Sequence, residues 1–317
     1  MPQGIPLWHL LKKDEDFMIE KFYDELEEVY QTGDAAAIEG FLQESMLSSG
    51  SGSTNGIRIA ASNELGNFYL NNGRPKEAVN SFQQAKALVL ETYDPRSLEY
   101  ANIVNNFANA CRVSGDMDVA LREYEEALAV YRELGKTEGY FYSAALNNIA
   151  IIYIQKKRYD DAKAALQQAL ASTEQKADLL PERAVALTNM GSLYMYEKKH
   201  QEALKYVKEA ISIYDALPDE KKTNMAAAYN TLGDLLVQEK QLEDAAAAYA
   251  AAKALMVQFC GKNLEYITIC RKLAMVYSKQ KNYRKRDAKV KEALDIMEKL
   301  GFSGTKLYED TKKIGEQ

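Results

Sequence analysis

The stretch that decides the fold is residues 65–85, LGNFYLNNGRPKEAVNSFQQA. Counted from Gly66, positions +3 and +16 are aromatic and positions +12 and +19 are small: Tyr69, Phe82, Ala78 and Ala85. Closely packed helices need this alternation, because a small side chain on one helix makes room for a large one on the other. The stretch therefore predicts a helical hairpin with a close helix–helix contact.

The same spacing recurs along the chain. A small residue occupies the position of Gly66, here called the phase position, in six copies: Gly66, Ala108, Ala150, Gly191, Gly233 and Ala274. Consecutive phase positions are 41 or 42 residues apart. Position +12 is also small in every copy but the last, where it holds Arg286. A fixed period of this size is typical of stacked repeats. The 317 residues are therefore expected to form one row of hairpins instead of two globular cores.

A tight turn must join the two helices of each copy. In the first copy the turn falls at Gly73, the first helix is expected over residues 56–72, and Pro75 opens the second helix, where its missing N–H costs nothing. Gly115 takes the place of Gly73 in the second copy, and later copies have lysine there: Lys157, Lys198, Lys240 and Lys281. If the backbone of these lysines is in the left-handed conformation, each lysine lowers stability by about 1 kcal/mol relative to glycine.

This pattern resembles the tetratricopeptide repeat (TPR), whose signature has Leu-Gly, Tyr, Ala and Phe at these spacings, and the resemblance covers about residues 57–300. The 42-residue period and strings such as ALNNIAIIY (residues 145–153) look more like the long-helix subtype of kinesin light chains than the 34-residue form. The resemblance implies an all-α fold: a right-handed superhelical solenoid of helix-turn-helix repeats, or α-α superhelix. The signature Trp is replaced in every copy: Ser62, Val104, Leu146, Leu187, Tyr229 and Cys270.

Three parts are expected along the chain. Residues 1–52 are expected to form an N-terminal capping hairpin and a linker. The hairpin is either a separate cap or a degenerate repeat, and the linker contains the run SSGSGS at residues 48–53. Residues 53–300 hold the six repeats. Residues 301–317 read as a capping helix, with Leu307, Thr311 and Ile314 at helical spacing.

Composition excludes several classes of protein. A net charge of −6 argues against a nucleic-acid binder, and the lack of a long apolar run argues against a membrane span. Two histidines and three scattered cysteines leave little for a metal site, a cofactor or a catalytic set, so we expect no enzyme. In residues 1–17, here called the leader, the lysines follow the short apolar run around Trp8. A secretory signal has the opposite order, so the sequence favours a cytoplasmic protein.

The concave face of a solenoid, formed by the first helix of each copy, is its usual binding surface. Asparagine is a poor residue inside helices, yet it occupies the position three before the phase in four copies: Asn63, Asn105, Asn147 and Asn230. The resemblance to kinesin light chains implies that such carboxamides bind the backbone of an extended peptide. The alternative is that they only bridge adjacent helices. The full set expected to line the groove is Asn63, Asn67, Asn105, Asn109, Arg112, Asn147, Ile154, Asn189, Met195, Asn230, Asp234 and Arg271.

Charge is unevenly distributed. Residues 14–44 hold eleven acids and one lysine, a net of −10, whereas residues 271–291 hold nine bases and one acid, a net of +8. Either these are solvated helix faces, or the charge separation steers an acidic partner to the basic C-terminal end or favours head-to-tail contact between copies, with weak salt-dependent self-association.

The function expected from these features is a non-catalytic scaffold or adaptor that binds a protein or peptide segment. Two alternatives stay open: a regulator that senses a peptide, and a structural subunit of a larger assembly. A carboxylate clamp for chaperone C-termini, which uses Lys or Arg together with Asn, is not expected, since only Arg112 and Arg271 come close to that pattern.

Overall fold

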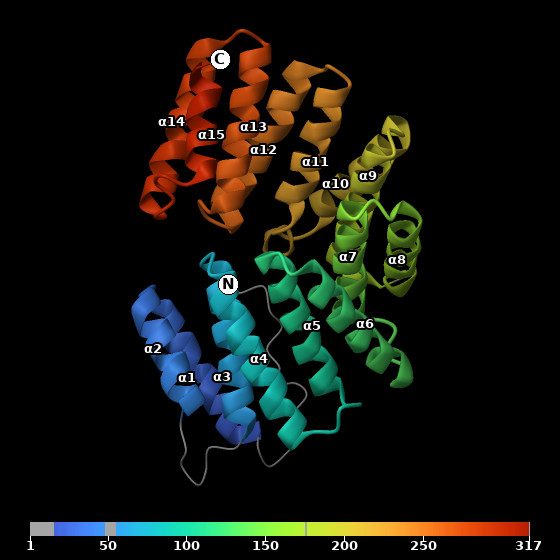
Figure 1. The fold of residues 1–317 in the computed structure, drawn as a ribbon. Helices are drawn as coiled ribbons and strands as arrows, with labels where there is room; N and C mark the ends of the chain where they lie inside the picture. The colour runs from blue at the N-terminus through green and yellow to red at the C-terminus, as the bar shows by residue number, and fades with distance from the viewer. Residues whose placement is uncertain (1–15, 48–54, 175, 317) are drawn as a thin grey trace. The chain divides into compact units, whose positions relative to one another are not determined.

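The computed structural model describes residues 16–47, 55–174 and 176–316 (Figure 1). All regular structure within those residues is helical, with two short 3₁₀ turns, η2 (Ala177–Leu179) and η3 (Asp219–Lys221). The α-helices are α1 (Asp16–Gln31), α2 (Ala35–Leu47), α3 (Asn55–Asn71), α4 (Pro75–Thr92), α5 (Leu98–Ser114), α6 (Met117–Glu133), α7 (Tyr140–Gln155), α8 (Tyr159–Ser172), α9 (Leu180–Tyr196), α10 (His200–Ala216), α11 (Met225–Gln238), α12 (Leu242–Phe259), α13 (Leu264–Lys279), α14 (Tyr283–Lys299) and α15 (Lys306–Glu316).

The chain divides into two compact units, with the boundary inside α7, between Ile152 and Tyr153. In unit 1, α3 packs against α4 and α5 against α6, and α4 packs against α5, so consecutive hairpins stack (Figure 1). The hairpin of α1 and α2 lies against α3, with Ile19, Phe22 and Leu42 buried in its core.

Unit 2 repeats the same arrangement. Helices α9 and α10, α11 and α12, and α13 and α14 form hairpins, and each hairpin packs against the next through α10 with α11 and α12 with α13. Helix α15 covers α14 and α13 with Tyr308, Thr311 and Ile314 buried. The all-α stack of helix-turn-helix repeats expected from the period is thereby confirmed.

The phase glycines sit where two helices nearly touch. A Cβ on Gly66 would lie 2.6 Å from the ring of Phe82, and one on Gly233 would lie 2.5 Å from the ring of Tyr249. At Gly191 the nearest atom would be a methyl of Val207 at 2.3 Å. In each case the contact is the residue at +16, as the alternation of small and large residues predicts.

The hairpin turns also follow the prediction. Gly73 and Gly115 have positive φ, and the four lysines at the equivalent position are left-handed with φ between 57° and 62°: Lys157, Lys198, Lys240 and Lys281. Pro75 opens α4 as expected, while the first helix runs over Asn55–Asn71, one residue earlier than predicted at each end.

Some predictions concern residues beyond those described. The leader around Trp8 and the linker-like run at residues 48–53 lie outside the described residues. Among the described helices, none has both the length and the apolar character that crossing a membrane requires.

Candidate functional site

The first helix of each hairpin, called the A helix here, is α3, α5, α7, α9, α11 or α13. Positions −3, +1 and +4 from the phase residue lie four and three residues apart, so they share one side of each A helix. We call this set the A-helix stripe: Asn63, Asn67, Leu70; Asn105, Asn109, Arg112; Asn147, Ile151, Ile154; Thr188, Ser192, Met195; Asn230, Asp234, Val237; and Arg271, Met275, Ser278.

On α5 the stripe contains polar atoms that have no partner among the described residues. Asn105 is only 4% exposed, yet its Oδ1 accepts no hydrogen bond. Seven residues on, Arg112 donates from a terminal nitrogen to Asn109 Oδ1 at 2.9 Å and also interacts with the buried Tyr124 hydroxyl, while its buried Nε has no acceptor among the described residues. An unpaired buried polar atom costs about 1–3 kcal/mol, and in this section of the stripe the half-exposed side chains of Asn109 and Arg112 are the ones within reach of a polar ligand.

The neighbouring helix α3 uses its asparagines differently. Asn63 is 1% exposed, its Oδ1 accepts from Asn106 Nδ2 at 2.9 Å, and its Nδ2 donates to Glu64 at 3.2 Å. Asn67 also donates to Glu64, at 3.4 Å. Asn63 thus ties two A helices together, which is the bridging role that stood as the alternative to peptide binding.

Sequence reasoning missed the importance of Glu64. Its carboxyl group is 4% exposed, and burial raises its pKa to about 7 despite hydrogen bonds from Asn67, Asn63 and Tyr23. Because Tyr23 belongs to α1 and Glu64 to α3, this buried carboxyl joins the N-terminal hairpin to the first repeat. A glutamate in place of asparagine at position −2 was the available signal.

The section of the stripe on α7 is mostly closed. Asn147 is buried and its Nδ2 lies 3.5 Å from the Ser143 hydroxyl, and Ile154 is buried as well. On α9, Met195 packs in a cluster with Leu235 of α11, so it serves as a packing residue, whereas Asn189 is half-buried. Tyr196, one position further along α9, is 56% exposed.

In unit 2 the polar part of the stripe lies on α11 and α13. Lys272 donates to Asn230 Oδ1 at 2.9 Å and to Asp234 Oδ2 at 2.7 Å, and Tyr249 donates to the other oxygen of Asp234 at 2.6 Å. Asn230 is therefore a second bridge between A helices. Arg271 is half-buried and its Nε has no acceptor among the described residues.

A polar cluster at two joins between hairpins was also missed. We call these the join clusters: Lys86, Tyr100, Glu123 and Glu126 in unit 1, and Lys253, Tyr266, Lys289 and Glu292 in unit 2. Both have Lys at +20 of one copy, and Tyr at −8 and Glu at +18 of the next, which is the signal that reveals them.

Their contacts correspond closely. Lys86 Nζ lies 2.5 Å from Glu123 and 3.2 Å from Glu126, and Tyr100 donates to Glu126. In unit 2 Lys253 Nζ lies 3.0 Å and Lys289 Nζ 2.5 Å from Glu292, to which Tyr266 also donates. These clusters fasten a B helix, the second helix of a hairpin, to the following hairpin.

The described residues offer little for catalysis. They contain no group of three or more His, Cys, Asp or Glu side chains placed to hold a metal ion. Cys111 and Cys270 are buried as expected for packing residues, and burial raises the pKa of each thiol to about 11. Such thiols are poor nucleophiles at neutral pH.

Comparison with known families identifies the repeat. A tetratricopeptide repeat model matches residues 57–133, 99–175 and 182–258, which together cover more than half of the chain. The chain belongs to the tetratricopeptide repeat family. TPR proteins are scaffolds for protein–protein interaction, so the broad class of function expected from the sequence is supported.

Individual relatives refine the subtype. The TPR chain is 23% identical over 229 residues to Protein KINESIN LIGHT CHAIN-RELATED 3 of Arabidopsis thaliana, covering 71% of this chain and 35% of that protein. It thus spans about a third of that relative's length. The predicted likeness to the kinesin-light-chain type of TPR is confirmed.

Two known structures share the fold. BtubC (BKLC) from P. vanneervenii superposes with a TM-score of 0.51 at 20% identity, covering 80% of this TPR chain and 94% of that one. NprR in complex with its cognate peptide NprX superposes with a TM-score of 0.66 at 18% identity, covering 96% and 86%.

Proposed function

We propose that this TPR protein is a non-catalytic cytoplasmic adaptor whose A-helix stripe binds an extended segment of a partner protein. The observation that carries the proposal is the set of polar side chains on one side of α5: Asn109 and Arg112 are half-exposed, and the buried Asn105 beside them has an unpaired Oδ1 that a turn of its carboxamide would present to a ligand. Asparagine offers an acceptor and arginine a donor, which is the pair of groups that a peptide backbone requires. The NprR structure, which contains a peptide, supports this use of the fold.

Within the stripe, the half-exposed members would contact the peptide directly: Asn67, Asn109, Arg112, Asn230, Asp234 and Arg271. The buried asparagines Asn63 and Asn147 would set the positions of the A helices. Exposed apolar side chains would contact hydrophobic anchors of the partner: Met275 within the stripe, and Val113 on α5 and Tyr196 on α9 next to stripe positions.

The test begins with selection of binding peptides from a random display library against the full chain. The affinity of a selected peptide is then measured for the native protein, for Asn109→Ala and Arg112→Ala, and for Lys205→Ala on α10 as a control on an exposed B-helix residue. Each stripe variant is expected to weaken binding about tenfold, which corresponds to roughly 1.4 kcal/mol, and the control to leave it unchanged. Equal affinities for all four proteins would contradict the proposal.

A second candidate is a regulator that changes shape when it senses a peptide, and the match to NprR over 96% of the chain favours it. Small-angle scattering with and without the selected peptide separates the two. A simple adaptor keeps the same radius of gyration, while a regulator of this kind shows a change.

A further inference from the structure

The described residues include two exposed surfaces of opposite charge. The acidic face consists of four exposed side chains on α1: Glu20, Asp24, Glu27 and Glu28. The basic tip consists of four exposed side chains around the turn between α13 and α14, and a fifth about two turns further along α14: Lys279, Lys281, Arg284 and Lys285, and Lys291. None of these nine side chains forms an ion pair within the part of the chain that the structure describes.

The acidic face is built by helical spacing. Ile19, Phe22 and Leu26 form the buried side of α1, and the four acids lie on its opposite side. The eight-residue span from Glu20 to Glu28 corresponds to about 12 Å of helix. Lys21 pairs with Glu25 at 3.5 Å and leaves the four acids of the face unneutralised.

The basic tip forms against two local preferences. Lys281 is held at a φ of 57°, a conformation that favours glycine. Helices α8, α10 and α12 each have an acid in their first turn, which suits the positive end of a helix, but α14 has none and begins with Tyr283 followed by Arg284 and Lys285. Cations near a helix N-terminus raise the energy of the free protein, and a bound anionic surface would lower it.

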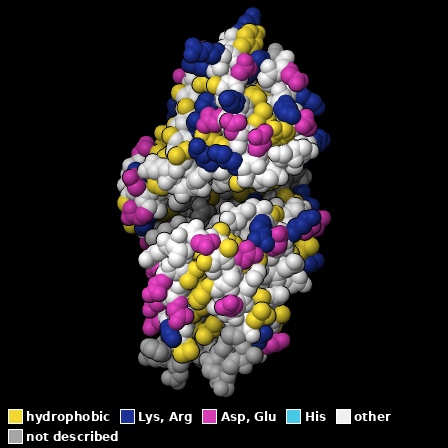
Figure 2. Space-filling view, turned by 90° about the vertical axis from the view of Figure 1, so that its left-hand side faces the viewer, with side chains coloured by type: hydrophobic (Ala, Val, Ile, Leu, Met, Phe, Trp, Pro, Cys, Tyr) yellow, Lys and Arg dark blue, Asp and Glu magenta, His cyan; other side chains and the backbone are white. Residues whose placement is uncertain are grey.

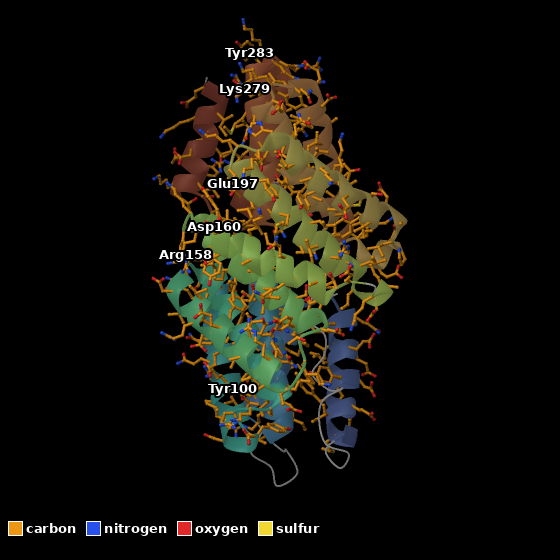
Figure 3. All side chains as sticks on the ribbon, turned by 90° about the vertical axis from the view of Figure 1, so that its right-hand side faces the viewer. Tyr100, Arg158, Asp160, Glu197, Lys279 and Tyr283 are labelled. Carbon is orange, nitrogen blue, oxygen red and sulfur yellow. The ribbon has the colours of Figure 1, made fainter. Side chains whose placement is uncertain are left out.

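Figure 3 shows where this tip lies in unit 2. The labelled residues Arg158, Glu197 and Lys279 mark the turns of the hairpins α7–α8, α9–α10 and α13–α14, and Lys279 and Tyr283 stand together at the last of them. Figure 2 shows dark blue side chains at the upper end of the molecule, with magenta side chains among them.

We propose that the acidic face of one copy of this protein binds the basic tip of a second copy. The two surfaces are complementary in sign and similar in number of charges, and every molecule contains one of each. Contacts between two different surfaces are heterologous, so copies join head to tail, and the assembly either closes into a ring or continues as an open chain. Exposed ion pairs of this kind are weak singly and strongly screened by salt.

The test is sedimentation velocity of the full chain over a range of protein concentrations at about 0.03 M and about 0.3 M salt. The expected result is concentration-dependent association at low salt, with a dissociation constant at least about tenfold larger at high salt. The basic-tip variant Arg284→Gln with Lys285→Gln, and the acidic-face variant Glu20→Gln with Asp24→Asn, are each expected to be monomeric. The control Lys205→Gln with Lys208→Gln removes the same charge from α10 and is expected to associate like the native chain.

A mixing experiment tests the head-to-tail arrangement itself. The acidic-face variant keeps an intact basic tip and the basic-tip variant keeps an intact acidic face, so an equimolar mixture is expected to form one-to-one dimers and nothing larger. A native chain that stays monomeric at both salt concentrations would overturn the proposal. So would association that survives either neutralised surface, or a mixture that remains monomeric.

Discussion

The hairpin turns of the two units differ in residue but not in backbone. In unit 1 Gly73 and Gly115 close the turns, whereas in unit 2 the same left-handed position holds Lys157, Lys198, Lys240 and Lys281. Since glycine adopts this conformation without strain, unit 1 follows the local preference of the chain and unit 2 opposes it at four consecutive tips. The repeat therefore tolerates a strained backbone at the hairpin tips of unit 2, where a charged lysine stands in the position that an uncharged glycine holds in unit 1.

The join clusters extend the comparison. They share lysine, tyrosine and glutamate, but the fourth member is Glu123 in unit 1 and Lys289 in unit 2. In unit 1 burial alone would lower the pKa of Lys86, but the hydrogen bond and charge of Glu123 raise it. In unit 2 burial works to raise the pKa of Glu292, but hydrogen bonds from Lys289, Tyr266 and Lys253 lower it to about 2. The same arrangement of contacts thus holds a cluster with one Lys and two Glu in unit 1 and a cluster with two Lys and one Glu in unit 2, so the net charges of the two clusters are opposite.

The largest expected effect comes from breaking each join cluster at its shared ion. Lys86→Met removes the cation that pairs with Glu126 and leaves Glu123 with only the exposed Arg122, 3.4 Å away, and Glu292→Gln leaves Lys253 and Lys289 without the anion that they share. Each is expected to lower the free energy of unfolding by about 2–4 kcal/mol, with the larger loss in unit 1, where Glu123 is the more buried partner. Urea unfolding measures both, against Lys205→Met as the control. Losses below about 0.5 kcal/mol, the range of ordinary surface substitutions, would show that the clusters do not hold the hairpins together.

The next effect is an opposite pH dependence in the two units. The pKa of Glu64 in unit 1 is raised to about 7, so the folded state holds its proton more tightly than the unfolded chain. Its contribution to stability is full below its ordinary pKa, falls as pH rises toward about 7, and is constant above that. Glu292 in unit 2 has a lowered pKa, so its contribution is full above the ordinary value and is lost as pH falls toward about 2.

Amide hydrogen exchange read separately on α3 and α13 measures this difference. Between pH 5 and pH 8, after correction for intrinsic exchange rates, protection of α3 is expected to fall while that of α13 stays constant. Glu64→Gln is expected to abolish the pH dependence on α3. An α3 response that persists in this variant would rule out Glu64 as its source.

The smallest effect concerns the turns. Lys198→Gly is expected to raise the free energy of unfolding by up to about 1 kcal/mol, and Gly115→Lys to lower it by a similar amount. Thermal melts of the two variants beside the native chain measure both changes. If Lys198→Gly destabilises the protein instead, side-chain contacts of the lysine outweigh the strain, and the difference between the units has another origin.

The fold was predictable because its signals are local and repeated. The 42-residue spacing, the small residue opposite Phe82 or Tyr249, and the glycine or lysine turns all act within one hairpin. The site was less predictable because its hydrogen bonds cross from one repeat to the next. Nothing in the spacing distinguishes Asn63, which accepts from Asn106, from Asn105, whose Oδ1 accepts from no described residue. Burial of Ile154 and Met195 likewise depends on neighbouring helices.

The measurement that tests the central claim most directly compares Asn105→Ala with Asn63→Ala, recording both affinity for a selected peptide and free energy of unfolding. Asn105→Ala is expected to weaken binding about fivefold or more while changing stability by less than about 0.5 kcal/mol, because its Oδ1 has no partner in the described residues. Asn63→Ala is expected to cost about 1–2 kcal/mol of stability, because Asn106 and Glu64 lose a partner. An Asn105→Ala protein with native affinity and reduced stability would contradict the account and make the asparagines purely structural.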